Sequence, residues 1–575
     1  MNSKNITKYL IACSLCCGGA TAFDGCADWD DHYDANSELL DTQQSTLWEN
    51  IANTDNLSQF ASLLKKVDYD AVLNASQTYT VWAPVNGSFD YETVNAFSDE
   101  RLRREFIENH IARSNYPASG VLDNLPIYTL NEKLAHFNGD LYYDMQGISV
   151  VRPNLASENG TIHLLGGKIP FVQNIYESLN ANEFPIDSIS NFYHSYDVKK
   201  LNEYKSVQGP TVNGEITYLD SVFDEHNDLF ADYYAYINRE DSNYSMIIPT
   251  NDAWTKAKEK VSQYFHYVPS FEFIEDLATK LKTKVEIADV QYLQDSMVNR
   301  MLTANLYYNN NLYDNKKLKT LNTGETLQCD SLYSTLRRKV YSEDAASLLH
   351  GATRYTCSNG IAWITDSLRM QPWLFWNPEI VVEGETSQYL ANTNNVYEPV
   401  QRVTVVGENQ NPEISGRLSK DVYLEAQPAS SNVNPEVDYY LPDVRSTTYS
   451  IYIVIVPPHI TSTVGTNKPN RFSVSMGYAD ASGINDDSNR KWVAESNFVS
   501  DTTKIDTIYL GDFTFPMAYA GTGNYYPYLR VSSSVTNRDR LNYDRTLRID
   551  CIILRPKELD DYLKEYPDYK YDKGE

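Results

Sequence analysis

The sequence TVWAPVNGSF at residues 80–89 is the main guide to the fold, because the same pattern returns as SMIIPTNDAW at residues 245–254. Each is a short β-prone run, then a proline, then an asparagine two residues on, then an aromatic residue three further on. Each is followed downstream by a second motif that begins with Asn-Gly, NGTIH at 159–163 and NGIAW at 359–363. An ordered pair of motifs that occurs twice indicates a duplicated domain.

The first motif of each pair predicts a strand, a stop and a helix. Pro84 has no N–H and ends ladder pairing. Asn86 or Ser88 can cap the helix that follows, and Phe89 would lie under that helix. The Asn-Gly pair predicts a tight turn with positive φ, directly before an apolar strand.

These motifs resemble the two signature boxes of the fasciclin domain, an extracellular adhesion-type module. Asn109-His110 resembles the central Asn-His segment of that family, whereas residues 301–306 of the second copy hold no histidine. The resemblance implies adhesion or ligand capture, without catalysis, over residues 45–375. The signature positions, to which we assign structural roles, are Pro84, Asn86, Asn109, His110, Asn159, Gly160, Pro249, Asn251, Asn359 and Gly360.

We expect an α+β protein whose 575 residues hold about three domains, at roughly 100–200 residues per domain. Two fasciclin-like domains, each a small sheet with helices, precede an all-β antiparallel sandwich. A long helix is expected near 284–306 in the second repeat, and Trp373, Phe375 and Trp376 are expected to form a wedge against the sandwich. The expected boundaries are a signal peptide at 1–25, an acidic tether at 26–44, domains at 45–180, 187–375 and 378–557, and an acidic tail at 558–575.

The sandwich is predicted from short β-rich runs that alternate with polar turns after Pro378. Its closing strand, Leu547–Leu554, and the run Thr507–Phe515 resemble galactose-binding-like jelly-roll modules. Asp550 in the closing strand is the residue most typical of that group. Because many members bind carbohydrate, the resemblance implies a glycan ligand.

The N-terminus predicts export and a lipid anchor. Lys4 and Lys8 precede an apolar or small stretch of 15 residues, which is too short to span a bilayer. Cys26 and the acidic cluster behind it resemble the start of mature Bacteroidetes surface lipoproteins, so we expect acylation at Cys26 and a surface-exposed place on the outer membrane. Cys13 follows a better lipobox but a shorter apolar region, and simple secretion remains a third reading.

The net charge of the chain argues against some classes of binding partner. The chain carries 49 Lys+Arg against 77 Asp+Glu, a net charge of −28 with a sequence pI near 4.7. No basic stripe interrupts this excess, so the sequence predicts no nucleic-acid partner and no peripheral binding to anionic lipid.

The sequence predicts no enzyme, no metal and no cofactor. It contains no nucleophile elbow, zincin helix or phosphate-binding glycine loop. His110 and His163 belong to the fasciclin boxes and are expected to bridge the domain by hydrogen bonds. Cys329 and Cys357 lie in expected strands, where either a disulfide or two buried thiols would fit, and Cys551 is expected to be a buried thiol.

Tyrosine is unusually frequent in this chain, at 45 of 575 residues. Its apolar face and polar tip suit stacking on sugars or peptides. The glycine-rich loop at 517–528 is a candidate ligand site with a hairpin that caps the core as its alternative. The candidate ligand residues are Trp492, Tyr519, Tyr525, Tyr526 and Tyr528.

The function that these features favour is non-catalytic capture of a ligand at the cell surface, with a glycan as the expected ligand. The resemblance to such lipoproteins places them beside uptake complexes of the SusC/SusD type, which makes such a transporter a second expected partner. The alternative is an adhesin that binds a host or neighbour-cell protein through the fasciclin-like domains.

Overall fold

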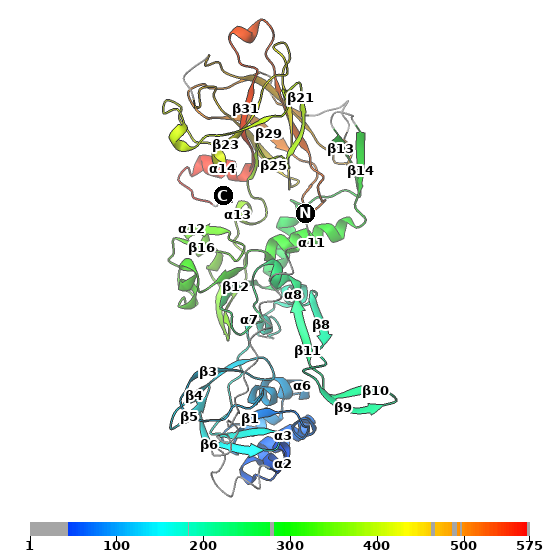
Figure 1. Cartoon of the computed structure of the whole chain (residues 1–575), viewed down its shortest axis with the longest axis vertical. Helices are drawn as coiled ribbons and strands as arrows, with labels where there is room; N and C mark the ends of the chain where they lie inside the picture. The colour runs from blue at the N-terminus through cyan, green and yellow to red at the C-terminus, as the bar shows by residue number, and fades with distance from the viewer. Residues whose placement is uncertain are drawn as a thin grey trace, which may run out of the picture. The chain divides into compact units, whose positions relative to one another are not determined.

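The computed structural model describes residues 44–181, 183–276, 281–461, 466–485, 492–494 and 497–571. These residues fold into two compact units. The first runs to Phe171 and also takes in Lys199–Asp224, and the second comprises Val172–Val198 and the chain from Glu225 onward (Figure 1). The expected signal peptide, the expected tether up to residue 43 and Cys26 lie outside the described residues.

The first unit is built on a seven-stranded sheet in the order β2-β1-β7-β6-β5-β4-β3. Its helices pack one face through a core that includes Leu47, Phe60 and Ile162. The hairpin β9–β10 (Val207–Val212, Glu215–Asp220) belongs to the same unit, since Val207 joins this core. The helices are α2 (Leu47–Ala52), α3 (Ser58–Lys66), α4 (Tyr69–Leu73), α5 (Tyr91–Asn95) and α6 (Asp99–Leu102). The strands are β1 (Tyr79–Pro84), β2 (Ile111–Arg113), β3 (Leu122–Tyr128), β4 (Leu134–Gly139), β5 (Tyr143–Met145), β6 (Ile148–Ser157) and β7 (Gly160–Leu165).

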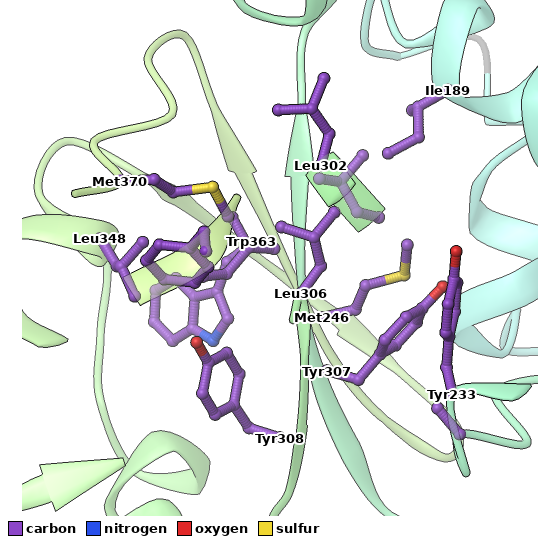
Figure 2. Packing of buried hydrophobic residues seen from close by; sticks show 14 of the residues in the cluster. Ile189, Tyr233, Met246, Leu302, Leu306, Tyr307, Tyr308, Leu348, Trp363 and Met370 are labelled. Carbon is purple, nitrogen blue, oxygen red and sulfur yellow. The ribbon is translucent and has the colours of Figure 1, made fainter. Parts of the chain in front are cut away.

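The second unit opens with a smaller sheet, in the order β15-β12-β19-β18. Tyr307 and Tyr308 are neighbours on β15 and point to opposite faces, toward Tyr233 and toward Trp363 (Figure 2). The strands are β12 (Tyr244–Pro249), β15 (Tyr307–Asn309), β18 (Thr353–Cys357) and β19 (Gly360–Thr365). The helices around them are α7 (Ile175–Ser178), α8 (Asp187–His194), α9 (Asp228–Asp232), α10 (Asn251–Ser262), α11 (Val290–Thr303), α12 (Ser342–Leu349) and α13 (Pro372–Phe375).

Both sheets share one pairing scheme, which identifies them as repeats. β1 runs parallel to β7 with Tyr79 opposite Gly160, and β12 runs parallel to β19 with Tyr244 opposite Gly360. A short antiparallel strand flanks each pair on the outer side, β2 in one sheet and β15 in the other. We call α2 to β7 the first repeat and α7 to α13 the second repeat.

The C-terminal part is a sandwich of two antiparallel six-stranded sheets. One sheet has the order β22-β23-β31-β25-β29 with β20 paired to β31, and the other has the order β21-β24-β30-β26-β27 with β28 paired to β26. The first sheet consists of β20 (Ile380–Glu383), β22 (Gln401–Thr404), β23 (Val422–Ala426), β25 (Thr448–Ile455), β29 (Asp506–Thr514) and β31 (Leu547–Pro556). The second consists of β21 (Leu390–Asn394), β24 (Glu436–Tyr440), β26 (Arg471–Gly477), β27 (Trp492–Val493), β28 (Phe498–Val499) and β30 (Tyr528–Ser533). The expected α+β protein with a β-rich C-terminal part is confirmed.

The second repeat and the sandwich are joined by a broad seam. The hairpin of β13 (Ser270–Asp276) and β14 (Leu281–Glu286) buries Phe271 and Phe273 in the core of the sandwich. In return, α14 (Lys557–Glu565) buries Leu559 in the core of the second repeat. Trp373, Phe375 and Trp376 are buried at this seam, as the expected wedge requires.

The compact units and the observed elements differ in places from the expected ranges. Residues 172–180 belong to the second unit, and residues 199–224 belong to the first. The segment expected as an acidic tail, 558–575, holds most of helix α14, and Leu559, Tyr569 and Tyr571 pack in or against the core of the second repeat. The helix expected near 284–306 is α11, and its N-terminal part is the strand β14 instead.

Candidate functional site

The signature asparagines are internal clamps and not ligand contacts. The N–H of Leu47, first in α2, donates to Asn159 Oδ1 at 2.8 Å, and the N–H of Ile175, first in α7, donates to Asn359 Oδ1 at 2.9 Å. Each amide nitrogen donates to two carbonyl oxygens of its own repeat. Asn86 and Asn251 likewise accept from the second helix of each repeat, from the N–H of Gln59 in α3 and of Ser188 in α8.

The two fasciclin-box histidines are also structural. His110 Nδ1 lies 2.7 Å from the carbonyl of Phe106, and its Nε2 accepts from the N–H of Ile169. Burial lowers the pKa of His110 and of His163 to about 4, so both rings are neutral at pH 7. The strand register places Leu306 of the second repeat where the first has His110.

The aromatic loop at 517–528 does not form the predicted ligand surface. Tyr519 is 1 % exposed, its oxygen accepts from the N–H of Ala479 at 2.6 Å, and Tyr528 is fully buried. The loop packs instead against the second repeat, where Tyr267 donates to the carbonyl of Ala520 at 2.6 Å. Burial therefore contradicts a ligand role for Tyr519 and Tyr528, and the alternative of a core-capping segment fits the contacts.

The other candidates of that group are half-buried. Trp492 lies against Phe513, and Tyr526 lies against Tyr389 and Tyr440. Tyr525 packs beside Phe273 of the β13–β14 hairpin, at 5.9 Å between ring centroids. Their ligand role stays a prediction.

The sequence left open whether Cys329 and Cys357 form a disulfide or are two buried thiols. Cys329 and Cys357 are both buried and free, so the disulfide is not formed. Burial raises the pKa of Cys329 to about 11, which keeps the thiol protonated and unreactive near neutral pH. Cys551 is a buried free thiol in β31, where it was expected.

The structure offers a different site, a tyrosine-lined groove of about 830 Å³ at the seam of the second unit. One wall is the segment of β16 (Ser331–Tyr333), β17 (Lys339–Tyr341) and the start of α12. The other wall is the end of α14 and the residues up to Lys570. Its aromatic lining residues are Tyr341, Tyr562, Tyr566 and Tyr569. We call this site the tyrosine groove.

The two walls are held together by one tyrosine hydroxyl. Tyr569 donates to Asp344 Oδ2 at 2.6 Å and accepts from Trp373 Nε1 at 3.0 Å. Burial raises the pKa of Asp344, an effect that the Tyr569 hydrogen bond partly offsets. The C-terminal segment is therefore anchored on the second repeat through a buried carboxyl group.

The tyrosine rings that line the groove differ in how exposed they are to solvent. Tyr562 lies 4.7 Å from Tyr566 and 4.9 Å from Tyr569 between ring centroids, and Tyr566 is 48 % exposed. On the opposite wall, the Lys339 ammonium lies 4.4 Å from the centre of the Tyr341 ring. Such preorganised aromatic surface costs little side-chain entropy when a ligand stacks on it.

The charge of the groove is negative. Its carboxylates outnumber its two cations, Lys339 and Lys570. The acidic lining residues are Asp330, Glu343, Asp344, Glu565 and Asp568. Carboxylates accept hydrogen bonds from hydroxyl or ammonium donors, so the groove suits a neutral polyol or a cationic segment and disfavours an anion.

The sequence reasoning missed this site although a signal was present. The C-terminal run YLKEYPDYKY holds four tyrosines in ten residues, at 562–571. Their charged neighbours suggested an acidic tail. The tyrosine spacing was the signal for a packed, ring-bearing segment.

Part of the chain matches a known protein family. Residues 55–167 match the model of the fasciclin domain, which covers the body of the first repeat. No curated protein matches the chain. The second repeat lies outside the matched residues and shares its strand register and its asparagine clamp with the first repeat.

Among solved structures, the likenesses are distant. A Paenibacillus xanthan lyase is 12 % identical with a TM-score of 0.21, over 35 % of this chain and 16 % of that enzyme. A FAS1 domain pair from the insect cell adhesion molecule Fasciclin I is 12 % identical with a TM-score of 0.17, over 57 % and 97 %. A family 35 carbohydrate binding module from Clostridium thermocellum is 11 % identical with a TM-score of 0.17, over 31 % and 96 %. At these TM-scores the likenesses carry no weight for function.

Proposed function

We propose that this protein captures a neutral glycan, without catalysis, and that the tyrosine groove is the binding site. The observation that carries the proposal is the groove itself, in which four tyrosines and five carboxylates line about 830 Å³. A site of that volume is within the range of roughly 300–1,000 Å³ that is usual for small-ligand pockets. Sugar rings would stack on the exposed faces while their hydroxyls donate to the carboxylates.

The binding mode follows from which groups are free. Tyr566 is the most accessible ring, whereas the hydroxyl of Tyr569 is already used by Asp344 and Trp373. We therefore assign stacking to Tyr566 and Tyr341, and a positioning role to Tyr569. Affinity in such an open site would be modest and would gain from a high density of copies.

A second candidate function is adhesion to a protein. The acidic lining of the groove favours a segment rich in Lys or Arg, and the fasciclin domain of residues 55–167 fits an adhesion-type role. The two functions differ in salt dependence, because attraction between charges is screened over about 10 Å at 0.1 M salt whereas sugar stacking is not.

The cellular setting is part of the proposal. Acylation at Cys26 would hold the protein on the outer face of the outer membrane, where a transporter of the SusC/SusD type would take up the captured ligand. Within the described ranges, no helix has both the length and the apolar character needed to cross a bilayer.

The test is affinity gel electrophoresis of the full mature chain in gels that hold neutral polysaccharides. We expect retardation by at least one of them, and we expect Tyr566→Ala and Tyr341→Ala to reduce it severalfold. Tyr313→Ala is the matched control, because Tyr313 is 64 % exposed on the same repeat but does not line the groove. Equal retardation of all variants, or no retardation by any polysaccharide, would refute the proposal.

A further inference from the structure

We propose that the sandwich carries a second binding site, a basic pocket that takes the carboxylate or sulfate group of an acidic sugar. The pocket has a volume of about 410 Å³. It lies where β25 has ended and where β26 and β31 begin, and its cationic lining residues are Lys468, Arg540, Arg545 and Arg548. Such a cluster is unexpected in a chain of net charge −28.

Arg545 is the central residue of this pocket. It is 7 % exposed, and its guanidinium donates to the carbonyls of Val535 and Ser431 and to Asn537 Oδ1. Among the described residues, no carboxylate lies within ion-pair distance of it. A buried cation that meets only neutral acceptors is poorly compensated, and an incoming oxyanion would neutralise it.

Two further cations stand beside it without a described carboxylate partner. Lys468 donates to the carbonyl of Arg540 at 3.1 Å, and Arg540 itself is exposed. Arg548 differs, since Glu425 and Asp544 lie 2.8 Å and 2.7 Å from its guanidinium. The only acidic group among the lining residues that the structure describes, Asp544, is thus already paired. The pocket keeps a local positive charge.

The other lining residues indicate a sugar acid. Ser431, Thr466 and Thr546 supply hydroxyls, and Tyr543 supplies a ring. Arginine binds carboxylate and sulfate through parallel N–H donors, and the volume suits one or two sugar rings. A local pocket of this size also differs from the extended basic stripe that nucleic acids require.

The basic pocket is independent of the tyrosine groove. Arg545 precedes β31 and α14 follows it, so the 10 residues of this strand separate the two sites by about 30 Å at roughly 3.3 Å per residue. The sites also have opposite charge. The inference therefore stands whether or not the groove binds glycan.

Isothermal titration calorimetry on the full mature chain tests the inference. The probes are an oligogalacturonate, the matched galactose oligosaccharide and inorganic sulfate. We expect the oligogalacturonate to bind at low salt, to weaken as NaCl is added, and to bind at least tenfold more tightly than the other two. The double variant Lys468→Gln/Arg540→Gln should weaken binding at least tenfold, and it spares the buried Arg545.

The matched control is Arg402→Gln/Arg417→Gln, which makes the same change in charge at two exposed positions of the sandwich that do not line the pocket. We expect it to bind within twofold of the wild type, as should Tyr341→Ala in the groove. Equal binding of the charged and uncharged oligosaccharides, or an unchanged affinity in the pocket variant, would overturn the inference. Sulfate that binds as tightly as the oligogalacturonate would overturn the assignment to a sugar.

Discussion

Asp550→Asn should make the sandwich more stable at alkaline pH and should remove part of its pH dependence. Asp550 lies in β31, is 2 % exposed and accepts from the N–H of Ser419 at 3.2 Å. Burial is the main reason that its pKa rises from 3.8 to about 7, and the nearby Glu383 and Glu385 add to it. A shift of that size corresponds to about 4 kcal/mol at roughly 1.4 kcal/mol per pKa unit, which is an upper estimate.

The sign follows from proton linkage. Because the folded state binds this proton more tightly than the unfolded chain, stability from this group is greatest below about pH 4 and falls as the pH rises toward 7. Asparagine cannot ionise, so the variant should gain relative to the wild type between pH 5 and pH 8, by about 2–4 kcal/mol.

Urea unfolding of both proteins at pH 5 and pH 8, followed by tryptophan fluorescence, measures the difference. EDTA in the buffer prevents a divalent cation from neutralising the carboxylates around Asp550. Asp421→Asn, an exposed acid of the same domain, is the control. A gain that is equal at the two pH values, or a wild type that is relatively more stable at pH 8, would refute the reasoning.

Three further substitutions test the clamps and the groove. Asn359→Ala removes the acceptor of α7 and two bonds to carbonyls, and it should cost about 2–4 kcal/mol of unfolding free energy in urea titrations. Gly360→Ala should cost more and reduce soluble yield, because φ is +149° and a Cβ would lie 1.9 Å from the carbonyl oxygen of Tyr244. Tyr569→Phe leaves Asp344 without its hydroxyl partner, and it should cost about 2 kcal/mol and weaken glycan binding without removing a stacking face.

Each of these has a control and a contrary outcome. Asn322→Ala changes an exposed asparagine of the same repeat and should leave the unfolding free energy nearly unchanged. If it lowered stability as much as Asn359→Ala, the hydrogen bonds of Asn359 would not be the cause of the loss. Gly324→Ala also has positive φ but open space around its Cβ, so it should be milder than Gly360→Ala. Tyr313→Phe should leave glycan binding unchanged, and wild-type binding by Tyr569→Phe would show that the anchor does not shape the groove.

The duplication was readable from the sequence because its determinants are local. Pro84 and Pro249 end strands, and the turns at Gly160 and Gly360 need positive φ. Each motif therefore determines its local backbone conformation without help from distant residues. The antiparallel sandwich followed from alternating β-rich runs for the same reason. The start of the second repeat was misplaced because α7 is only four residues long and shows no helical periodicity.

The candidate site could not be predicted in the same way. Asp344 and Tyr569 are 225 residues apart, and only the folding of α14 against the second repeat brings them together. The sequence could not separate the two alternatives for the loop at 517–528, a ligand site or a core-capping segment, for a related reason. Its composition suits a ligand loop, but the partner that covers Tyr519 is the distant β13–β14 hairpin, which contributes Phe271 at 5.7 Å between ring centroids.

Hydrogen–deuterium exchange with and without a neutral polysaccharide reports where on the whole protein the ligand binds, and so tests the assignment of the site. The probe is the polysaccharide that retards the chain most in gels. We predict slower exchange at residues 331–344 and 562–570, with no change at 517–528. Protection confined to the 517–528 loop, or to the first repeat, would contradict the assignment of the site to the tyrosine groove.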